Sequence, residues 1–504
     1  MFGMMGLSTW KSRVRKGWRG KILGQNLSVS RFLPPKVWSN AYSQEMAKPR
    51  ALIWLRRDLR LEDHTLLAHA ESEGWEVALA FVFDEKILGS LPKSDRRVSF
   101  FHAALEEVDA QLRERGSRLV ARHGDPVKEI PVLAKALGAD HVLAAEDCEP
   151  YAIRRDGAVK KALGPIPLTL HSDQSLFRPA EIRNGSGAPY RVFTAYKNEC
   201  LRRLDGSHLD KRGRGLPRLM AAGELESACH RWDLKTLGFE RQKLWLEPGS
   251  SAAKKRLAAF GKHIAGYETS RNVPSIEGGT SGLSAHLRFG TISIRACARL
   301  ANSVENQGAA TWLTELLWRD FFMMILAEFP HVGTGRAFHE AYDKIEWPGT
   351  DAHFRAWKEG RTGFPLVDAA MRHFAETGWM HNRLRMVVAS FLVKDLLVDW
   401  RKGEKYFAEN LLDFDLAANN GGWQWSASTG CDSQPYFRVF NPVSQSEKFD
   451  PEGEFIKAHV PELAKVGARD IHEPPPLLRG KYPAQIVDHS VRREKAIALF
   501  KGVR

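Results

Sequence analysis

The hydrophobic pattern of this 504-residue chain changes near its midpoint, and that change limits the folds open to it. Between residues 50 and 171, short apolar runs alternate with stretches of helical spacing, whereas beyond Trp245 the strand-like runs stop. Alternating strands and helices predict a parallel sheet covered by helices on both faces, and uninterrupted helical spacing predicts an all-α domain. We therefore expect an α/β domain followed by a larger helical domain.

The spacing of the apolar residues also predicts individual elements. Strands are expected over residues 51–55, 77–83, 118–121, 141–145 and 167–171, which would form a five-stranded, doubly wound parallel sheet. One helix is expected over residues 96–115, ending before Gly116, and another beginning at Pro126. No G-x-G-x-x-G motif follows the first strand, which argues against a Rossmann-type dinucleotide site there. Helices of the second region are expected over residues 252–264, 311–328, 365–377 and 383–399.

The expected domain boundaries follow these changes of pattern. They divide the chain into a basic extension over residues 1–48, the α/β domain over 49–175, an irregular connection over 176–245, the helical domain over 246–485 and a C-terminal tail over 486–504. Before Met46 the chain has eight Lys or Arg and a single acid, Glu45, a composition compatible with a mitochondrial transit peptide. A disordered tail or a translation start at Met46 is favoured over targeting, so we expect a cytoplasmic protein.

Charge and cysteine usage narrow the class of partner. The net charge of +14 favours a polyanionic partner. The five cysteines are scattered without a C-x-x-C motif, which indicates a reduced intracellular protein with neither a disulfide scaffold nor a metal site. No apolar run approaches the ~20 residues of a membrane span, and we expect a monomer with no membrane partner.

The segment over residues 413–430, DFDLAANNGGWQWSASTG, carries the densest chemistry in the chain. Its two aspartates and two asparagines offer hydrogen-bond partners, and its two tryptophans offer large aromatic faces. Gly421 and Gly422 suit a backbone that adopts unusual angles or lies close to a ligand. A planar heteroaromatic ligand needs both edge hydrogen bonds and stacking surfaces, so the segment predicts a site for such a ligand, in preference to a polar turn followed by core tryptophans.

Three further segments add to this site. In TWLTELLWRDFF, residues 311–322, Trp312, Glu315, Trp318 and Arg319 share one helix face. Either this face is functional or Glu315 and Arg319 simply pair at i, i+4 spacing. WMHNRLRM, residues 379–386, places basic groups at a helix start, where they either contact phosphate or flank the helix. GGTSGLSAHLRFG, residues 278–290, is a Gly, Ser and Thr-rich loop suited to phosphate, although such a loop is more often an ordinary helix cap.

Taken together and in this order, these motifs resemble the photolyase/cryptochrome flavoproteins. The resemblance runs from ALIWLRRDLRLEDHTLL at residues 51–67 to about residue 483, and it is strongest to class I-type cyclobutane pyrimidine dimer photolyases. It implies FAD in the helical domain, UV-damaged DNA as partner, and light-driven electron transfer to a flipped-out pyrimidine dimer. The expected enzyme is a deoxyribodipyrimidine photo-lyase, a carbon–carbon lyase.

The resemblance assigns the following residues to the flavin. It implies cofactor contacts from Tyr267, Thr280, Ser281, Gly282, Leu283, Ser284, Trp312, Arg319, Asp413, Phe414, Asp415 and Asn419. Asn419 would face flavin N5, where an amide favours the reduced cofactor, whereas plant signalling cryptochromes carry an aspartate there. Trp423, Trp400 and Trp347 match the family's electron-relay tryptophans, although buried tryptophans usually only pack.

A second group of residues is assigned to the lesion and to DNA. Glu315 would hydrogen-bond a pyrimidine edge, Trp318 and Trp425 would pack against the extruded dimer, and Asn382 and Met386 would complete the pocket that Asn419 joins. The resemblance implies that DNA is contacted by Arg271, Glu315, Trp318, Arg319, Asn382, Arg383 and Gln445.

The chain also departs from the family pattern. Gly282 stands where many relatives have arginine, which puts one phosphate contact in doubt. CEPYAIRRD, residues 148–156, occupies the region where some relatives hold a folate with an Asn-Glu pair. A second antenna chromophore, methenyltetrahydrofolate or 8-hydroxy-deazaflavin, is therefore expected without being assigned. The alternative functions are a cryptochrome-like blue-light receptor without repair and a generic flavin oxidoreductase. The latter would leave the indole-lined helix face unexplained.

Overall fold

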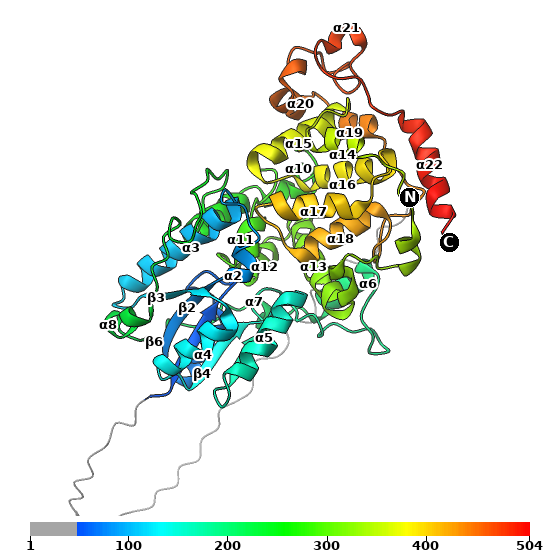
Figure 1. Ribbon diagram of the computed structural model, residues 1–504. Coiled ribbons are helices and arrows are strands. Elements are labelled where there is room, and N and C mark those ends of the chain that lie inside the picture. Colours follow the sequence, from blue (N-terminus) through cyan, green and yellow to red (C-terminus); the bar gives the residue numbers. More distant parts are fainter. Residues whose placement is uncertain (1–47, 504) are drawn as a thin grey trace, which may run out of the picture. The chain divides into compact units, whose positions relative to one another are not determined.

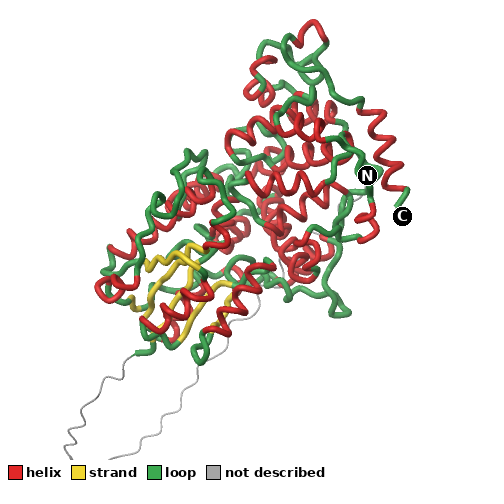
Figure 2. The backbone as a smooth tube through the Cα atoms, in the orientation of Figure 1, coloured by secondary structure: helices red, strands yellow, loops and turns green. Residues whose placement is uncertain are grey.

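The structure is a computed structural model and describes residues 48–503. The expectations for the extension before Met46 therefore concern residues outside the described part. The described chain begins with an α/β region whose strands are gathered in one sheet (Figure 2). These strands are β1 (Arg50–Leu55), β2 (Glu76–Asp84), β3 (Leu119–Gly124), β4 (His141–Ala145) and β5 (Leu168–His171). Their order is β3-β2-β1-β4-β5 and every pairing is parallel, so the predicted doubly wound fold class is confirmed.

Helices cover both faces of this sheet because β1 is apolar on both sides (Figure 1). Ile53 and Leu55 pack with residues of α1 (Thr65–Glu73) and α3 (Arg96–Arg113). Leu52 and Trp54 point the other way and pack with α4 (Pro126–Ala136) and α5 (Pro150–Ala162). Successive side chains of a strand point to opposite faces, which explains why one apolar run serves two cores.

Short elements fill the connection that follows. They are α6 (Phe193–Arg203), α7 (Gly206–Leu209), β6 (Arg218–Leu219), α8 (Ala222–Leu225) and a 3₁₀ turn, η1 (Glu226–Ala228); α2 (Glu85–Leu88) precedes them in the α/β region. The two residues of β6 pair in parallel with Glu76 and Val77 at the start of β2. The sequence analysis missed β6, because two residues are too few to show a period.

From residue 246 to residue 503 the described chain contains helices and loops only, as predicted (Figure 2). The helices are α9 (Ser250–Gly261), α10 (Tyr267–Ser270), α11 (Ser284–Phe289), α12 (Ile294–Ser303), α13 (Gln307–Glu328), α14 (Asp351–Lys358), α15 (Pro365–Thr377), α16 (Asn382–Ser390), α17 (Trp400–Asn410), α18 (Leu416–Ala427), α19 (Pro442–Phe449), α20 (Glu454–His459), α21 (Pro476–Arg479) and α22 (His489–Lys501). Within residues 48–503, none of the helices combines the length and apolar character needed to cross a bilayer.

The helix predicted over residues 383–399 ends early, which is a correction. Helix α16 stops at Ser390 and continues into one π-helical turn, η5 (Phe391–Asp395), after which Leu397 has a φ of 55°. Lys394 in this turn is fully buried and donates to Ser428 Oγ at 2.9 Å. Polar groups buried in this way need partners, and the wider turn gives them a direction that helical periodicity does not predict.

The C-terminal segment predicted as a tail contains a packed helix. In α22, Phe500 is fully buried and lies edge-on to Trp347, with ring centroids 5.9 Å apart. His489 Nδ1 lies 2.5 Å from Asp395 Oδ1 of the π-helical turn. Aromatic packing and a polar contact therefore both hold this segment against the helical region. The other predicted domain boundaries remain predictions.

Candidate functional site

The predicted lesion and DNA residues of α10, α13 and α16 are brought together. Arg271, which directly follows α10, forms an ion pair with Glu315 of α13, with Arg271 Nη1 2.7 Å from Glu315 Oε1. Arg383 of α16 donates from Nη2 to Asn272 Oδ1 at 2.6 Å. Burial raises the pKa of Glu315, and the charges of Arg271 and Arg383 oppose this rise. Glu315 thus pairs with an arginine from another element, and the alternative of a Glu315–Arg319 pair is not what forms.

One face of α16 continues this cluster. Asn382 is exposed at the start of the helix, and its Nδ2 lies 4.0 Å from Met386 Sδ one turn later. The Arg383 guanidinium lies over the ring of Phe449 in α19, 4.2 Å from its centroid. Gln445 is on the same helix α19, and its Oε1 is buried without a hydrogen-bond partner in the described chain. Helices α13, α16 and α19, together with the two residues that follow α10, therefore contribute polar groups with unused hydrogen-bonding capacity.

The two tryptophans predicted to face the dimer are both half-buried. Trp318 of α13 stacks on Phe193 of α6, with ring centroids 3.6 Å apart and planes 13° apart. One face of the Trp318 indole is thus covered by the chain itself. Trp425 lies near the end of α18 and is also half-buried.

The two aspartates predicted to contact the flavin have different surroundings. Asp413 accepts a hydrogen bond from Arg385 Nη2 at 2.8 Å, while its Oδ1 is buried without a partner in the described chain. Asp415 caps α18 by accepting from the Ala418 amide and forms ion pairs with Arg57 and Arg288. Burial alone would raise the pKa of Asp415, but these arginines hold it well below its usual value. One carboxylate oxygen of Asp413 can therefore still accept a hydrogen bond from a ligand, whereas the carboxylate of Asp415 is already paired with Arg57 and Arg288.

Arg319 points toward the α/β region. Its Nη1 donates to the Gln174 carbonyl, and its Nη2 is buried without a partner in residues 48–503. Burial lowers the pKa of Arg319, and the nearby Asp415 opposes this effect. This inner position favours the predicted cofactor contact over the predicted DNA contact.

The two asparagines of α18, Asn419 and Asn420, have different hydrogen-bond partners. Asn419 is 8% exposed, and its Nδ2 donates to the Glu404 carbonyl at 3.1 Å, so its side-chain oxygen remains available. Asn420 donates to the Val332 carbonyl and accepts from Gln424 Nε2, which ties α18 to the neighbouring chain.

The two glycines of α18, Gly421 and Gly422, differ in what surrounds them. Both residues have helical geometry, so neither supplies an unusual backbone angle. A Cβ on Gly421 would overlap the ring of Phe322, with Cγ only 2.6 Å away, so this glycine permits close packing of α18 on α13. A Cβ on Gly422 would meet nothing within 4 Å. Gly421 therefore lies against a protein ring and Gly422 borders open space in the described chain, so a close approach to a ligand remains a prediction for Gly422 alone.

The remaining predicted cofactor residues lie on α10, α13 and the loop before α11. Tyr267 and Trp312 are buried and both contact Phe260, with ring centroids 5.5 and 4.8 Å apart. In the loop over residues 280–284, Leu283 is 1% exposed and Gly282 has a φ of +59°, a conformation that favours glycine. Thr280 and Ser281 are hydroxyl-bearing residues of this loop, Ser284 is the first residue of α11, and Phe414 packs on the large helical core.

The three predicted relay tryptophans share one hydrophobic cluster. Trp423 and Trp400 are buried in it, and Trp347 packs against it while remaining partly exposed. The indole nitrogens of Trp347 and Trp400 are buried without partners in the described chain. The cluster therefore connects a buried indole of α18 with a partly exposed one beside α22.

Sequence reasoning missed the partners that position these side chains. Arg57 reaches Asp415 from 358 positions away in the chain. Phe193 covers Trp318, and Asn272 orients Arg383. No local signal marks such residues, because their roles arise from contacts between distant segments.

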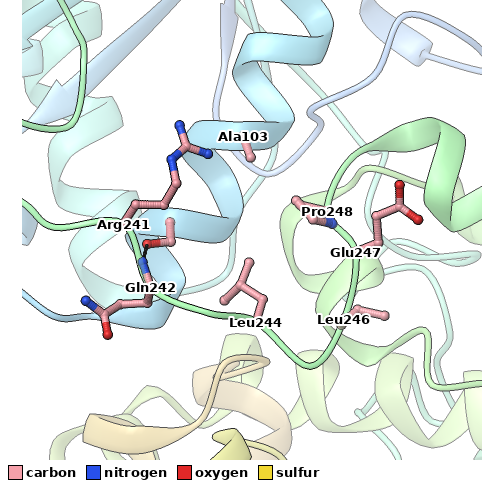
Figure 3. A pocket seen from close by; sticks show the side chains of 8 residues that line it. Ala103, Arg241, Gln242, Leu244, Leu246, Glu247 and Pro248 are labelled. Carbon is pink, nitrogen blue, oxygen red and sulfur yellow. Dashed lines mark hydrogen bonds between the residues drawn. The ribbon is translucent and has the colours of Figure 1, made fainter.

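The residues present fit a flavin dinucleotide. Unpartnered buried atoms include an acceptor, Asp413 Oδ1, and a donor, Arg319 Nη2, and Gly422 faces open space on the same helix as Asn419. A polar ring edge and a phosphate pair require acceptors and donors of this kind. A separate cavity of about 290 Å³ lies between α3 and the linker residues 241–248, and none of the predicted site residues lines it (Figure 3).

Comparison with known proteins agrees with this geometry. Residues 51–217 match the model of the family described as DNA photolyase, and residues 312–502 match the FAD binding domain of DNA photolyase. The chain belongs to the DNA photolyase family. It is 40% identical over 476 residues to the deoxyribodipyrimidine photo-lyase of Synechococcus, which covers 91% of this chain and 98% of that protein.

Solved structures of the family have the same fold. A class III photolyase from Agrobacterium tumefaciens superposes with a TM-score of 0.83 at 32% identity, covering 92% of this chain and 99% of that one. A cryptochrome from Synechocystis superposes with a TM-score of 0.81 at 25% identity, covering 90% and 99%. The fold is thus common to repair enzymes and to a cryptochrome, and function has to be argued from the site.

Proposed function

We propose that this photolyase-family protein repairs cyclobutane pyrimidine dimers in UV-damaged DNA, using light and reduced FAD. The observation that carries this proposal is the cluster around Glu315: a half-buried carboxylate beside two arginines, adjoining the exposed Asn382 and the half-buried Met386. A generic flavin oxidoreductase would not need a carboxylate beside cationic groups that can hold a nucleic-acid backbone.

The residues of this cluster would recognise the lesion. Glu315 accepts a hydrogen bond from a ring N–H of a pyrimidine, and Trp318 and Trp425 pack on its apolar face. Asn382 and Met386 form the adjoining wall. A dimer is already poorly paired, so flipping it out of the duplex requires less energy than flipping an intact base, and stacking on an aromatic ring offsets about 1–3 kcal/mol per base.

The DNA backbone would be held by charge. Arg271 and Arg383 supply positive charge at the cluster, and the net charge of +14 favours approach to a polyanion. Gln445 on helix α19 would add a neutral hydrogen bond to the backbone. Phosphate contacts of this kind position the duplex without reading its sequence. We accordingly expect binding that weakens as salt rises.

Reduced FAD, when bound, supplies the light-excited electron that splits the dimer. Asp413, Arg319 and Asn419 would hold and orient it through the unused atoms described above, with Tyr267, Trp312 and the loop over residues 280–284 around it. The apolar cluster from Trp347 through Trp400 to Trp423 would carry electrons inward from the surface. Its buried surroundings exclude water from that path.

Repair is tested with purified, reduced protein and UV-irradiated oligothymidine. The ultraviolet absorbance of the thymine bases is followed under blue light and in darkness, and recovery only in the light supports the proposal. A protein that binds FAD but restores no absorbance would instead be a blue-light receptor, the function that its similarity to a cryptochrome favours. A monomeric state, a cytoplasmic location and a second antenna chromophore are further parts of this proposal, which gel filtration, fractionation and the absorption spectrum would test.

A further inference from the structure

We propose that Arg256 of α9 binds the pyrophosphate of FAD. It would supply the positive charge that the phosphate loop lacks because position 282 is a glycine and not an arginine. A Cβ on Gly282 would overlap Arg256 Nη1, and it would lie 3.2 Å from the Arg256 Cζ. The guanidinium of a residue 26 positions earlier in the chain therefore occupies the space that a side chain at position 282 would fill. Gly282 has a φ of +59°, a conformation that favours glycine, so this position carries no side chain that would displace the guanidinium.

Unlike Arg57 and Arg288, Arg256 has no carboxylate partner within the described residues. Arg57 and Arg288 are both engaged by Glu149, at 3.2 and 2.7 Å, and both also pair with Asp415. In residues 48–503, Arg256 forms neither an ion pair nor a hydrogen bond, although it is half-buried and burial lowers its pKa. A partly desolvated cation without a counter-charge favours an anionic ligand.

The surroundings hold the guanidinium at the loop. It lies over the indole of Trp245, 5.4 Å from the ring centroid, a contact that orients its plane without neutralising its charge. His286 of α11 adds no charge, because burial and the nearby Arg256 lower its pKa to about 3. The hydroxyls of Thr280 and Ser281 belong to the same loop. A planar guanidinium beside hydroxyl groups suits paired phosphate oxygens.

The test measures FAD release from the holoprotein without DNA, followed by the rise in flavin fluorescence in samples kept in darkness between readings. Arg256→Gln should release FAD about tenfold to a hundredfold faster, the range expected when a hydrogen bond to a charged group is lost. Lys255→Gln is the matched control, since Lys255 is exposed on the same helix and the charge change is equal. Arg256→Lys should fall between wild type and Arg256→Gln, because it keeps the charge without the planar fork.

A double variant, Arg256→Gln with Gly282→Arg, should recover part of the FAD retention by returning a cation to the loop. DNA binding is the second arm, measured as fluorescence anisotropy of an undamaged duplex. Unchanged FAD release in Arg256→Gln overturns the proposal, as does equal release from the Lys255→Gln control. A loss of DNA affinity with FAD release unaltered would overturn it too, and would assign Arg256 to backbone phosphate. Repair activity does not enter these measurements, so they stand apart from the test of the proposed function.

Discussion

Replacing Glu315 by alanine should separate lesion recognition from stability. The Arg271–Glu315 pair spans 2.7 Å, with side chains 22% and 25% exposed. Ion pairs that remain open to solvent contribute about 1 kcal/mol or less to stability, although the burial that raises the pKa of Glu315 places this pair toward the upper end. Since domains are stable by about 5–15 kcal/mol, we expect Glu315→Ala to fold and to retain FAD.

The loss in repair should be larger than the loss in stability. A hydrogen bond that a pyrimidine N–H donates to a carboxylate is worth about 1.5–3 kcal/mol, and its loss corresponds to about a tenfold to a hundredfold slower repair at limiting substrate. Glu315→Gln keeps one acceptor oxygen without the charge, so its repair rate should lie between those of the wild type and Glu315→Ala. Repair is measured with UV-irradiated oligothymidine under blue light, and flavin content by its visible absorbance.

The last residue of helix α13, Glu328, provides a matched control. Glu328 pairs with Arg183 at 2.6 Å, with side chains 22% and 29% exposed, so Glu328→Ala removes a similar ion pair from the same helix. It should cause a similar small loss of stability and no loss of repair. Equal repair defects in Glu315→Ala and Glu328→Ala would show that Glu315 acts through stability alone, and a wild-type rate in Glu315→Ala would remove it from the lesion site.

Three further predictions concern the helical region. Gly421→Ala should lower the melting temperature, because overlap with Phe322 costs about 1–3 kcal/mol and outweighs the gain in helix propensity. Gly422→Ala is the control: its Cβ would enter open space, so the melting temperature of the flavin-free protein should not fall. Burial raises the pKa of Asp320 to about 7, so its stabilising contribution is present below its unfolded pKa and is lost as pH rises to about 7; Asp320→Asn should flatten this slope in urea unfolding. Trp423→Phe should slow photoreduction of oxidised flavin more than repair by pre-reduced protein, and loss of flavin would instead indicate a packing role.

The outcome for α16 shows where local pattern stops being informative. Its apolar residues keep helical spacing up to residue 399, yet the helix gives way to a π-helical turn after Ser390. The buried Lys394 donates to Ser428, which lies 34 positions away in the chain, and Asp395 contacts His489, which lies 94 positions away. Nothing in the spacing of residues 383–399 specifies those partners, because they are brought there by the packing of other helices.

The sequence by itself determined the class of fold and the residue types at the site, since strand and helix periods are local properties and the motifs are contiguous. Five strands and the helical second half were predictable for this reason, whereas the helix that holds Asn419 was not among the predicted ones. Only the tertiary structure decided which charges meet. Arg271 pairs with Glu315, Arg57 with Asp415, and Arg256 lies at the glycine of the phosphate loop. Such pairings depend on the angles and separations at which whole helices pack, and these are set by the summed contacts of many residues, so no short segment encodes them.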